Sequence, residues 1–236
     1  MATFLAQVNG LTNLAIDGSS TDPSDDELSQ FLKDGVIDVT NRCISMNPRN
    51  KEDFLRATST TSTNGLSVEG DVISVIREAE ADGDADGSTV WRECKKIPIS
   101  QQSRVVDVDS LHFASKYNPV YTIGSNGIVS VYPVPDGTND GFRVHYVNNE
   151  PKGDGLSDAL AAGHTTIGYF PTNKVYLVVI YAAIRSLEAK MADFAIDEED
   201  IELVQAITSN LTSLKQQYDG AFAIMAPRQQ QQGARA

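Results

Sequence analysis

The spacing of apolar residues changes twice along the chain. From Leu28 to Met46, apolar side chains recur every three or four residues, which predicts an amphipathic helix. Between residues 72 and 147, the chain instead carries short runs rich in β-branched residues, which are typical of strands. Helical spacing returns from Val175 to Phe222. This order favours an α+β fold, in which a helical bundle receives a small, mostly antiparallel β domain as an insertion.

The first helix carries its own start and stop signals. Ser24 and Glu27 have the spacing of a capping box, in which each side chain accepts a hydrogen bond from the backbone N–H group of the other residue. Pro48 ends the helix, because a residue that precedes proline is forced out of the α region. Residues 1–57 are therefore expected to form an N-terminal arm and this helix.

The middle of the chain, residues 65–150, is expected to be the inserted β-rich region. Residues 119–123 and 128–132 flank a turn that contains Asn-Gly, a pattern that predicts a hairpin. Residues 142–147 alternate between apolar and polar side chains and predict a further strand. Residues 58–63 are almost all serine and threonine, which predicts a loop ahead of the sheet.

The C-terminal part predicts a helical hairpin that completes the bundle, over residues 151–225. Val175 to Ile184 is apolar on all sides, which indicates a buried helix. That helix is expected to continue to Phe194, and an acidic run, Asp197 to Asp200, begins a second helix a few residues after it. The two helices are therefore expected to pair in antiparallel. Residues 226–236 contain a run of glutamines and are expected to form a flexible tail.

Composition argues against several classes of function. The chain has 236 residues, with 19 Lys and Arg against 32 Asp and Glu, and its formal charge of -13 disfavours a surface that grips nucleic-acid phosphates. Its two cysteines cannot build a disulfide framework. The longest apolar run is half of a membrane span, and the N-terminus has no signal-peptide pattern, so no membrane association is expected. Phosphate loops and nucleophile elbows are absent from the sequence, and we expect the chain not to be an enzyme.

One acidic segment matches the calcium-binding loop of EF-hand proteins. Asp82, Asp84 and Asp86 stand at alternate positions, a glycine follows them, and Glu93 supplies the final acid of the pattern. Two features argue against calcium: Thr89 replaces the usual aliphatic residue, and the flanking segments resemble strands rather than helices. A solvent-exposed hairpin tip has the same composition. We therefore expect no metal or cofactor, and calcium binding stays an alternative.

The other reactive side chains point to structure rather than chemistry. Cys43 lies on the apolar stripe of the first helix and is expected to be buried. Cys94 stands between Arg92 and Lys95, an environment that would lower the pKa of its thiol, but no partner base is visible. The three histidines do not have metal-ligand spacing, so each is expected to be packed or hydrogen-bonded.

Several segments follow one another in an order that is known from a family of viral proteins. A strand ending in Val75-Ile-Arg77 precedes the acidic loop and the basic segment 92–97. The segments Ser110–Ile123, Gly127–Pro135 and Phe170–Ile184 then follow. Over residues 71–194, this order and spacing resemble the head-to-tail adaptor proteins, also called connector or neck proteins, of tailed bacteriophages, especially those of marine phages.

The resemblance implies a function in the virion, at the neck between capsid and tail, after synthesis in the host cytoplasm. Such adaptors form a dodecameric ring beneath the portal protein, extend the DNA channel and offer a platform to the next neck or tail protein. Double-stranded DNA passes through the ring without sequence-specific binding, which suits an acidic chain. The tail, which carries Arg228 and Arg235, is expected to become ordered on docking to the portal.

Two alternatives remain open at the level of sequence. The chain is either another component of the virion, such as a tail-completion or baseplate protein, or a calcium-binding interaction module built on residues 82–93. Strands and helices alone do not separate the first alternative from the adaptor, because ring geometry depends on surfaces rather than on motifs.

Overall fold

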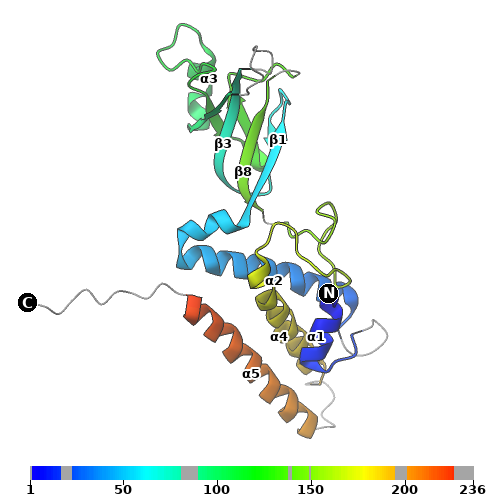
Figure 1. Ribbon diagram of the computed structural model, residues 1–236. Helices are drawn as coiled ribbons and strands as arrows, with labels where there is room; N and C mark the ends of the chain where they lie inside the picture. The colour runs from blue at the N-terminus through cyan, green and yellow to red at the C-terminus, as the bar shows by residue number, and fades with distance from the viewer. Residues whose placement is uncertain are drawn as a thin grey trace, which may run out of the picture. The chain divides into compact units, whose positions relative to one another are not determined.

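The chain folds into two compact units. The helical unit comprises residues 1–54 and 150–236, and the β unit comprises residues 55–149 (Figure 1). The fold is therefore α+β, as the sequence predicts, and the β unit is an insertion in the chain of the helical unit. The computed structural model describes residues 2–16, 23–80, 90–137, 140–148, 150–194 and 201–225.

Helix α4 (Val175–Phe194) is the centre of the helical unit. Its Leu177, Ala182 and Leu187 are fully buried, in agreement with the apolar run in the sequence. Three other helices pack against it, namely α1 (Phe4–Thr12), α2 (Asp25–Met46) and α5 (Ile201–Met225). Two short 3₁₀ turns, η1 (Pro48–Phe54) and η4 (Thr172–Lys174), complete the unit.

The start of α2 confirms the capping box. The Glu27 N–H donates to Ser24 Oγ at 3.3 Å, and the Ser24 N–H donates to Glu27 Oε2 at 2.8 Å. Farther along the helix, Gly35 faces α4 so closely that a Cβ atom would lie 3.0 Å from Tyr181 Cδ1. Glycine at this position lets the two helix backbones approach each other.

Helix α5 runs antiparallel to α4, as predicted. Tyr181 on α4 packs on Tyr218 with ring centroids 6.0 Å apart, and Glu188, farther along α4, pairs with the earlier Lys215 of α5 at 2.8 Å. Among the α5 side chains that the structure describes, the buried ones lie on one narrow seam, and they are Ile207, Leu214, Tyr218 and Phe222.

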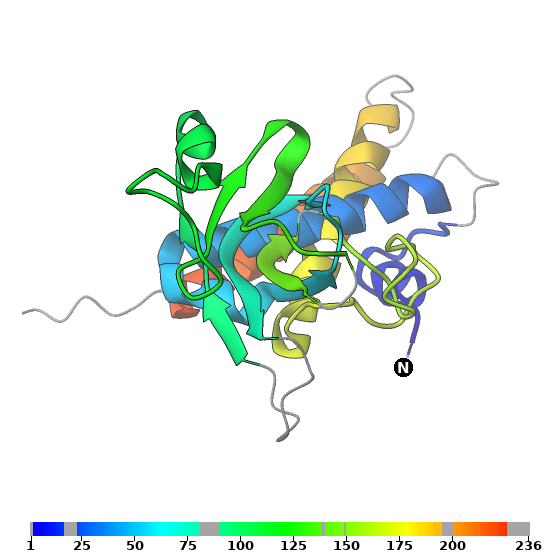
Figure 2. The same ribbon diagram turned by 90° about the horizontal axis from the view of Figure 1, so that it is seen from above.

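The segment between residues 150 and 171 holds the N-terminal helix in place. The N–H groups of Phe4 and Leu5 donate to the carbonyls of His164 and Ala162, both at 2.9 Å. These contacts satisfy donors that a helix leaves free in its first turn. Figure 2 shows this segment, in yellow-green, beside α1.

The β unit consists of two four-stranded sheets. The first has the strand order β1-β8-β3-β4 and the second β2-β7-β6-β5. All neighbouring strands are antiparallel except β5 and β6. The bounds are β1 (Leu55–Thr60), β2 (Leu66–Ser67), β3 (Gly70–Glu80), β4 (Val90–Glu93), β5 (Lys95–Lys96), β6 (Val120–Ile123), β7 (Ile128–Tyr132) and β8 (Phe142–Asn148).

The two sheets share one core. Val75, Phe142 and Val144 come from the first sheet, and Val129 and Val131 from the second. The hairpin predicted around Asn-Gly is confirmed, because β6 and β7 pair from Val120 with Tyr132 to Ile123 with Val129. Its turn includes the short η3 (Ser125–Gly127).

The loop predicted for residues 58–63 is wrong over its first half. Residues 55–60 form β1, an edge strand that pairs with β8 along its whole length, from Leu55 with Val147 to Thr60 with Phe142. Threonine has a high β propensity. The pairing with β8 supplies backbone hydrogen bonds that the polar composition of this segment does not predict. Strand pairing over a long sequence separation thus overrides the local composition.

Candidate functional site: an exposed apolar lobe

The most unusual surface of the β unit belongs to residues 95–118, here called the lobe. It begins with the short strand β5, continues through η2 (Ile99–Gln101) and α3 (Gln102–Val106), and ends before β6. Figure 1 shows it at the α3 label. Only Val105 and Ala114 of the lobe are buried, and with Val120 and Tyr132 they form a small cluster that joins the lobe to the second sheet.

Several large apolar side chains are exposed on the lobe. Leu111 is 103% exposed and Val108 is 76% exposed, so among the described residues Leu111 is left uncovered and Val108 is covered only in small part. Further exposed apolar side chains are Ile99, Val106, Phe113 and Tyr117. Scattered apolar residues are normal on protein surfaces, but a group within one segment of this size marks a surface for interaction.

Local hydrogen bonds hold the lobe in shape. The Ala114 N–H donates to the Val105 carbonyl at 3.0 Å and closes the lobe across its base. Within the turn, the Ser110 N–H donates to the Asp107 carbonyl at 3.1 Å, and the Asp109 N–H donates to Asp107 Oδ1 at 3.1 Å. The apolar side chains are thus displayed on a surface that is formed before any partner binds.

The lobe differs in charge from the rest of the chain. It carries Lys95, Lys96, Arg104 and Lys116 against Asp107 and Asp109, which leaves an excess of two positive charges in a chain of formal charge -13. A shallow hollow between η2 and α3, lined by Ile99, Ser103 and Val106 among others, adds relief to this surface. The lobe is therefore apolar, basic and uneven, which are properties of an interface.

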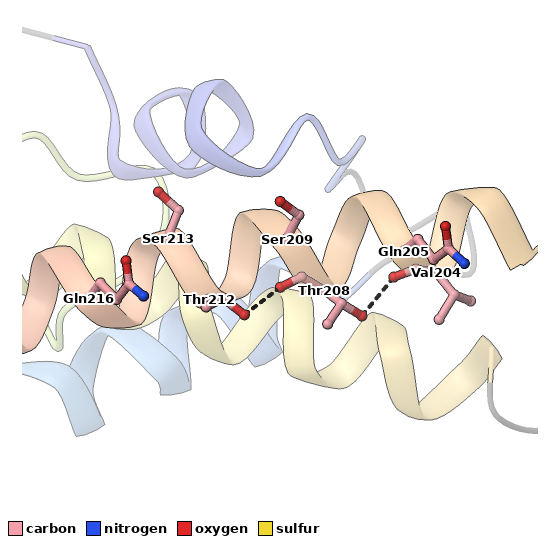
Figure 3. Close-up of a pocket in the computed structure, with 7 residues that line it drawn as sticks. All are labelled: Val204, Gln205, Thr208, Ser209, Thr212, Ser213 and Gln216. Atoms are coloured by element: carbon pink, nitrogen blue, oxygen red, sulfur yellow. Dashed lines mark hydrogen bonds between the residues drawn. The ribbon is translucent and has the colours of Figure 1, made fainter.

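A second surface, which is uncharged, lies on α5 (Ile201–Met225) of the helical unit. Seven residues line a shallow groove along this helix, and none of them is charged (Figure 3): Val204, Gln205, Thr208, Ser209, Thr212, Ser213 and Gln216. The hydroxyl of Thr208 donates to the Val204 carbonyl at 2.7 Å, and that of Thr212 to the Thr208 carbonyl at 2.8 Å. This face carries no charge, and two of its hydroxyl donors are satisfied by the helix itself.

A buried ion pair braces the β unit next to the core. Arg77 on β3 is 1% exposed, and its Nη2 lies 2.8 Å from Asp140 Oδ2. Its Nε donates to the Pro133 carbonyl at 2.9 Å, and its Nη1 donates to the Glu78 carbonyl. The guanidinium thus ties β3 to the chain between β7 and β8, and its role is structural.

The predicted calcium loop falls mostly outside the described residues. Asp82, Asp84 and Asp86 belong to that part of the chain, whereas Glu93 is exposed on β4 and pairs in register with Ile76. The flanking segments are the strands β3 and β4, not the helices of an EF-hand. Among the residues that the structure describes, no group of three or more His, Cys, Asp or Glu side chains is placed to hold a metal ion.

The proposed docking residues of the tail, Arg228 and Arg235, also lie outside the described residues.

Two of the histidines are hydrogen-bonded, as expected. His145 lies 3.2 Å from Ser74 Oγ, and the Nδ1 of His164 accepts the Ala161 N–H at 3.0 Å. His112 is exposed on the lobe.

Both cysteines are buried, and for Cys94 the prediction of a lowered pKa is wrong. Burial raises the pKa of the Cys94 thiol to about 12, and the nearby Arg77 guanidinium offsets this effect only in part. Arg92 and Lys95 are exposed, so their charges stay in solvent while the thiol enters the core. Cys43 is buried on α2 as predicted, and burial raises the pKa of its thiol as well.

We expect Cys94 to be inert toward thiol reagents in the folded protein. With Cys43→Ala as background, the native chain should not react with DTNB at about pH 8, and the unfolded chain should react fully, because the thiolate is the nucleophile. The unfolded thiol ionises near pH 9.0 and the folded one near 12, so stability should fall as pH rises through this window. Rapid stoichiometric labelling of the native chain would contradict the buried position.

Comparison with known proteins assigns no family. No protein-family model matches the chain, and no curated protein matches its sequence. Within the described part of the chain, the helices lack the combined length and apolarity needed to cross a membrane. The lobe was not expected as an interaction surface from the sequence. Its signal there is a set of apolar residues, interspersed with polar ones between Ile99 and Tyr117, that fits neither a helical nor a strand period.

Proposed function

We propose that the chain is a non-enzymatic structural protein of the virion. In this proposal it is a head-to-tail adaptor that forms a ring under the portal, extends the DNA channel and provides a platform for the next neck or tail protein. The observation that carries the proposal is the lobe, because its preformed, exposed apolar surface suits contact with another protein. The resemblance of residues 71–194 to phage adaptors supports the same conclusion.

The neutral face of α5 supports a channel through which DNA slides. Affinity for DNA comes mainly from Lys and Arg side chains that neutralise phosphates, and the seven residues of this face include neither. Such a face touches the DNA backbone without holding it. We further propose that residues 226–236, with Arg228 and Arg235, dock on the portal.

We expect the purified protein to bind double-stranded DNA only very weakly. In a fluorescence anisotropy titration at physiological salt, the Kd should be weaker than about 10⁻⁴ M, the upper end of the range for non-specific binding. The triple variant Gln205→Arg, Ser209→Arg and Gln216→Arg places cations on the α5 face and should gain salt-sensitive binding. Binding of the unmodified chain at low micromolar concentration would contradict a passive channel surface.

Immunogold electron microscopy of the source particles tests the proposed function. An antibody against this chain should place gold at the junction of capsid and tail. Gold elsewhere on the tail would replace the adaptor by a tail-completion or baseplate protein. Particles without label would reject the virion function, and a calcium titration of thermal stability would then test the interaction module at residues 82–93.

A further inference from the structure

We propose that the lobe binds the helical unit of a second copy of this chain. The inference rests on the proposed function, because it names the contact through which subunits of a ring join. It assigns a different surface to each side: the apolar, basic lobe on one subunit and the acidic helical unit on the next.

The first argument is the apolar surface itself. Val108 and Leu111 protrude from the lobe with almost no contact inside the β unit, although apolar side chains of this size favour burial. The hydrogen bonds at Asp107 and between Ala114 and Val105 fix the backbone that carries them. A partner therefore gains apolar contact without ordering a flexible loop, which keeps the cost of association low.

The second argument is charge complementarity, and it indicates which surface binds the lobe. The lobe has an excess of two positive charges, and the helical unit has eleven Lys and Arg against twenty Asp and Glu, an excess of nine negative charges. The β unit as a whole, with eight basic and twelve acidic residues, is less acidic, and a second lobe would repel the first. The helical unit of another copy is thus the favoured acceptor.

The third argument concerns symmetry. A contact between two lobes would be the same patch on both subunits and would close a dimer. A contact between a lobe and a helical unit joins two different patches, and each subunit keeps one patch of each kind free. Such head-to-tail contacts generate a ring when the rotation closes. The charge distribution therefore favours the type of contact that the proposed ring requires.

Photo-cross-linking between isotopically distinct chains tests this contact. Leu111 is replaced by p-benzoylphenylalanine, which costs no packing because the side chain is fully exposed. Equal amounts of unlabelled and ¹⁵N-labelled protein are mixed, irradiated and digested. We expect cross-linked peptides of mixed isotope that join residue 111 to peptides from residues 1–54 or 150–236.

Other cross-linking results would overturn the proposal. Cross-links of a single isotope only would show that the lobe contacts its own chain, and mixed cross-links confined to residues 55–149 would show that β units meet each other. The absence of cross-links at concentrations where the protein assembles, or a protein that stays monomeric throughout, would remove the contact.

A matched pair of variants gives an independent readout. Val108→Ser with Leu111→Ser should weaken self-association at least tenfold in analytical ultracentrifugation. Ile73→Ser, which alters another exposed apolar residue of the β unit outside the lobe, should leave it unchanged. Raised salt should also weaken association, because part of the attraction is electrostatic. Equal assembly of the lobe variant and the control would overturn the proposal.

The contact and the proposed function fail in different experiments. Immunogold at the neck together with a lobe that does not cross-link between copies keeps the adaptor and removes this interface. Mixed-isotope cross-links together with unlabelled particles keep the interface and remove the adaptor.

Discussion

Replacement of Arg77 by alanine is expected to destabilise the β unit by about 3–5 kcal/mol, the usual cost of removing one partner of a buried ion pair. The change leaves the Asp140 carboxylate almost fully buried without its main partner. Among the ion pairs that the structure describes, Asp140 then keeps only Lys116, whose Nζ lies 3.8 Å from Asp140 Oδ2. It also takes a donor from the Pro133 carbonyl. Loss of charge compensation, not loss of volume, is the main cause.

The single tryptophan makes this effect measurable in the β unit alone. Trp91 lies on β4 of the same sheet as Arg77, so its fluorescence during urea denaturation reports the unfolding of that unit. Arg92→Ala is the matched control, because Arg92 is exposed and stands opposite Arg77 in the β3–β4 register. The control should keep the midpoint of the wild type.

A double variant distinguishes the ion pair from simple packing. Arg77→Met combined with Asp140→Leu removes both charges and should recover most of the stability that Arg77→Ala loses, since apolar replacement of a whole buried pair is often close to neutral. Equal midpoints for Arg77→Ala and Arg92→Ala would show that the pair does not brace the unit.

Replacement of Leu177 by alanine is the second large effect, and it falls on the helical unit. Leu177 is fully buried on α4, against which α1, α2 and α5 pack, so the change leaves a cavity at the centre of the bundle. The expected loss is about 2–5 kcal/mol, the range for such truncations in protein cores. The far-UV helical signal is the readout, because α1, α2, α4 and α5 all belong to this unit.

Leu203→Ala is the control for this substitution. It makes the same chemical change on α5, at a side chain that is 42% exposed, and should cost less than about 1 kcal/mol. Leu177→Ala should also shift the midpoint of the Trp91 fluorescence transition less than it shifts the midpoint of the far-UV helical transition. A Leu177 variant as stable as the Leu203 control would contradict the central position of α4.

The sequence predicts best the elements that are specified locally. The capping box at Ser24 and Glu27, the hairpin around Asn126 and the apolar run of α4 each need only a few neighbouring residues, and the structure confirms all three. The strand β1 escaped prediction because its polar residues are held by β8, which lies about ninety positions later in the chain. Local composition does not predict a partner strand at such a distance in the sequence.

The candidate surfaces were harder to predict, because exposure depends on what the rest of the chain covers. Leu111 and Val108 have the residue types of a core, and only the folded structure shows that the described part of the β unit leaves them largely exposed. Cys94 illustrates the reverse case, since basic neighbours in sequence suggest a reactive thiol whereas burial in the core makes it inert. Neighbours in sequence and neighbours in space have different consequences for a pKa.

The way in which the β unit is attached has a consequence for the evolution of such chains. Its first and last strands pair side by side, with Leu55 opposite Val147, so the chain enters and leaves the unit at adjacent points. A genetic exchange that cuts near both points can replace the whole unit and leave every residue of the helical unit in place. The helical unit and the β unit are therefore free to diverge at different rates, and each unit can have relatives that do not share the other.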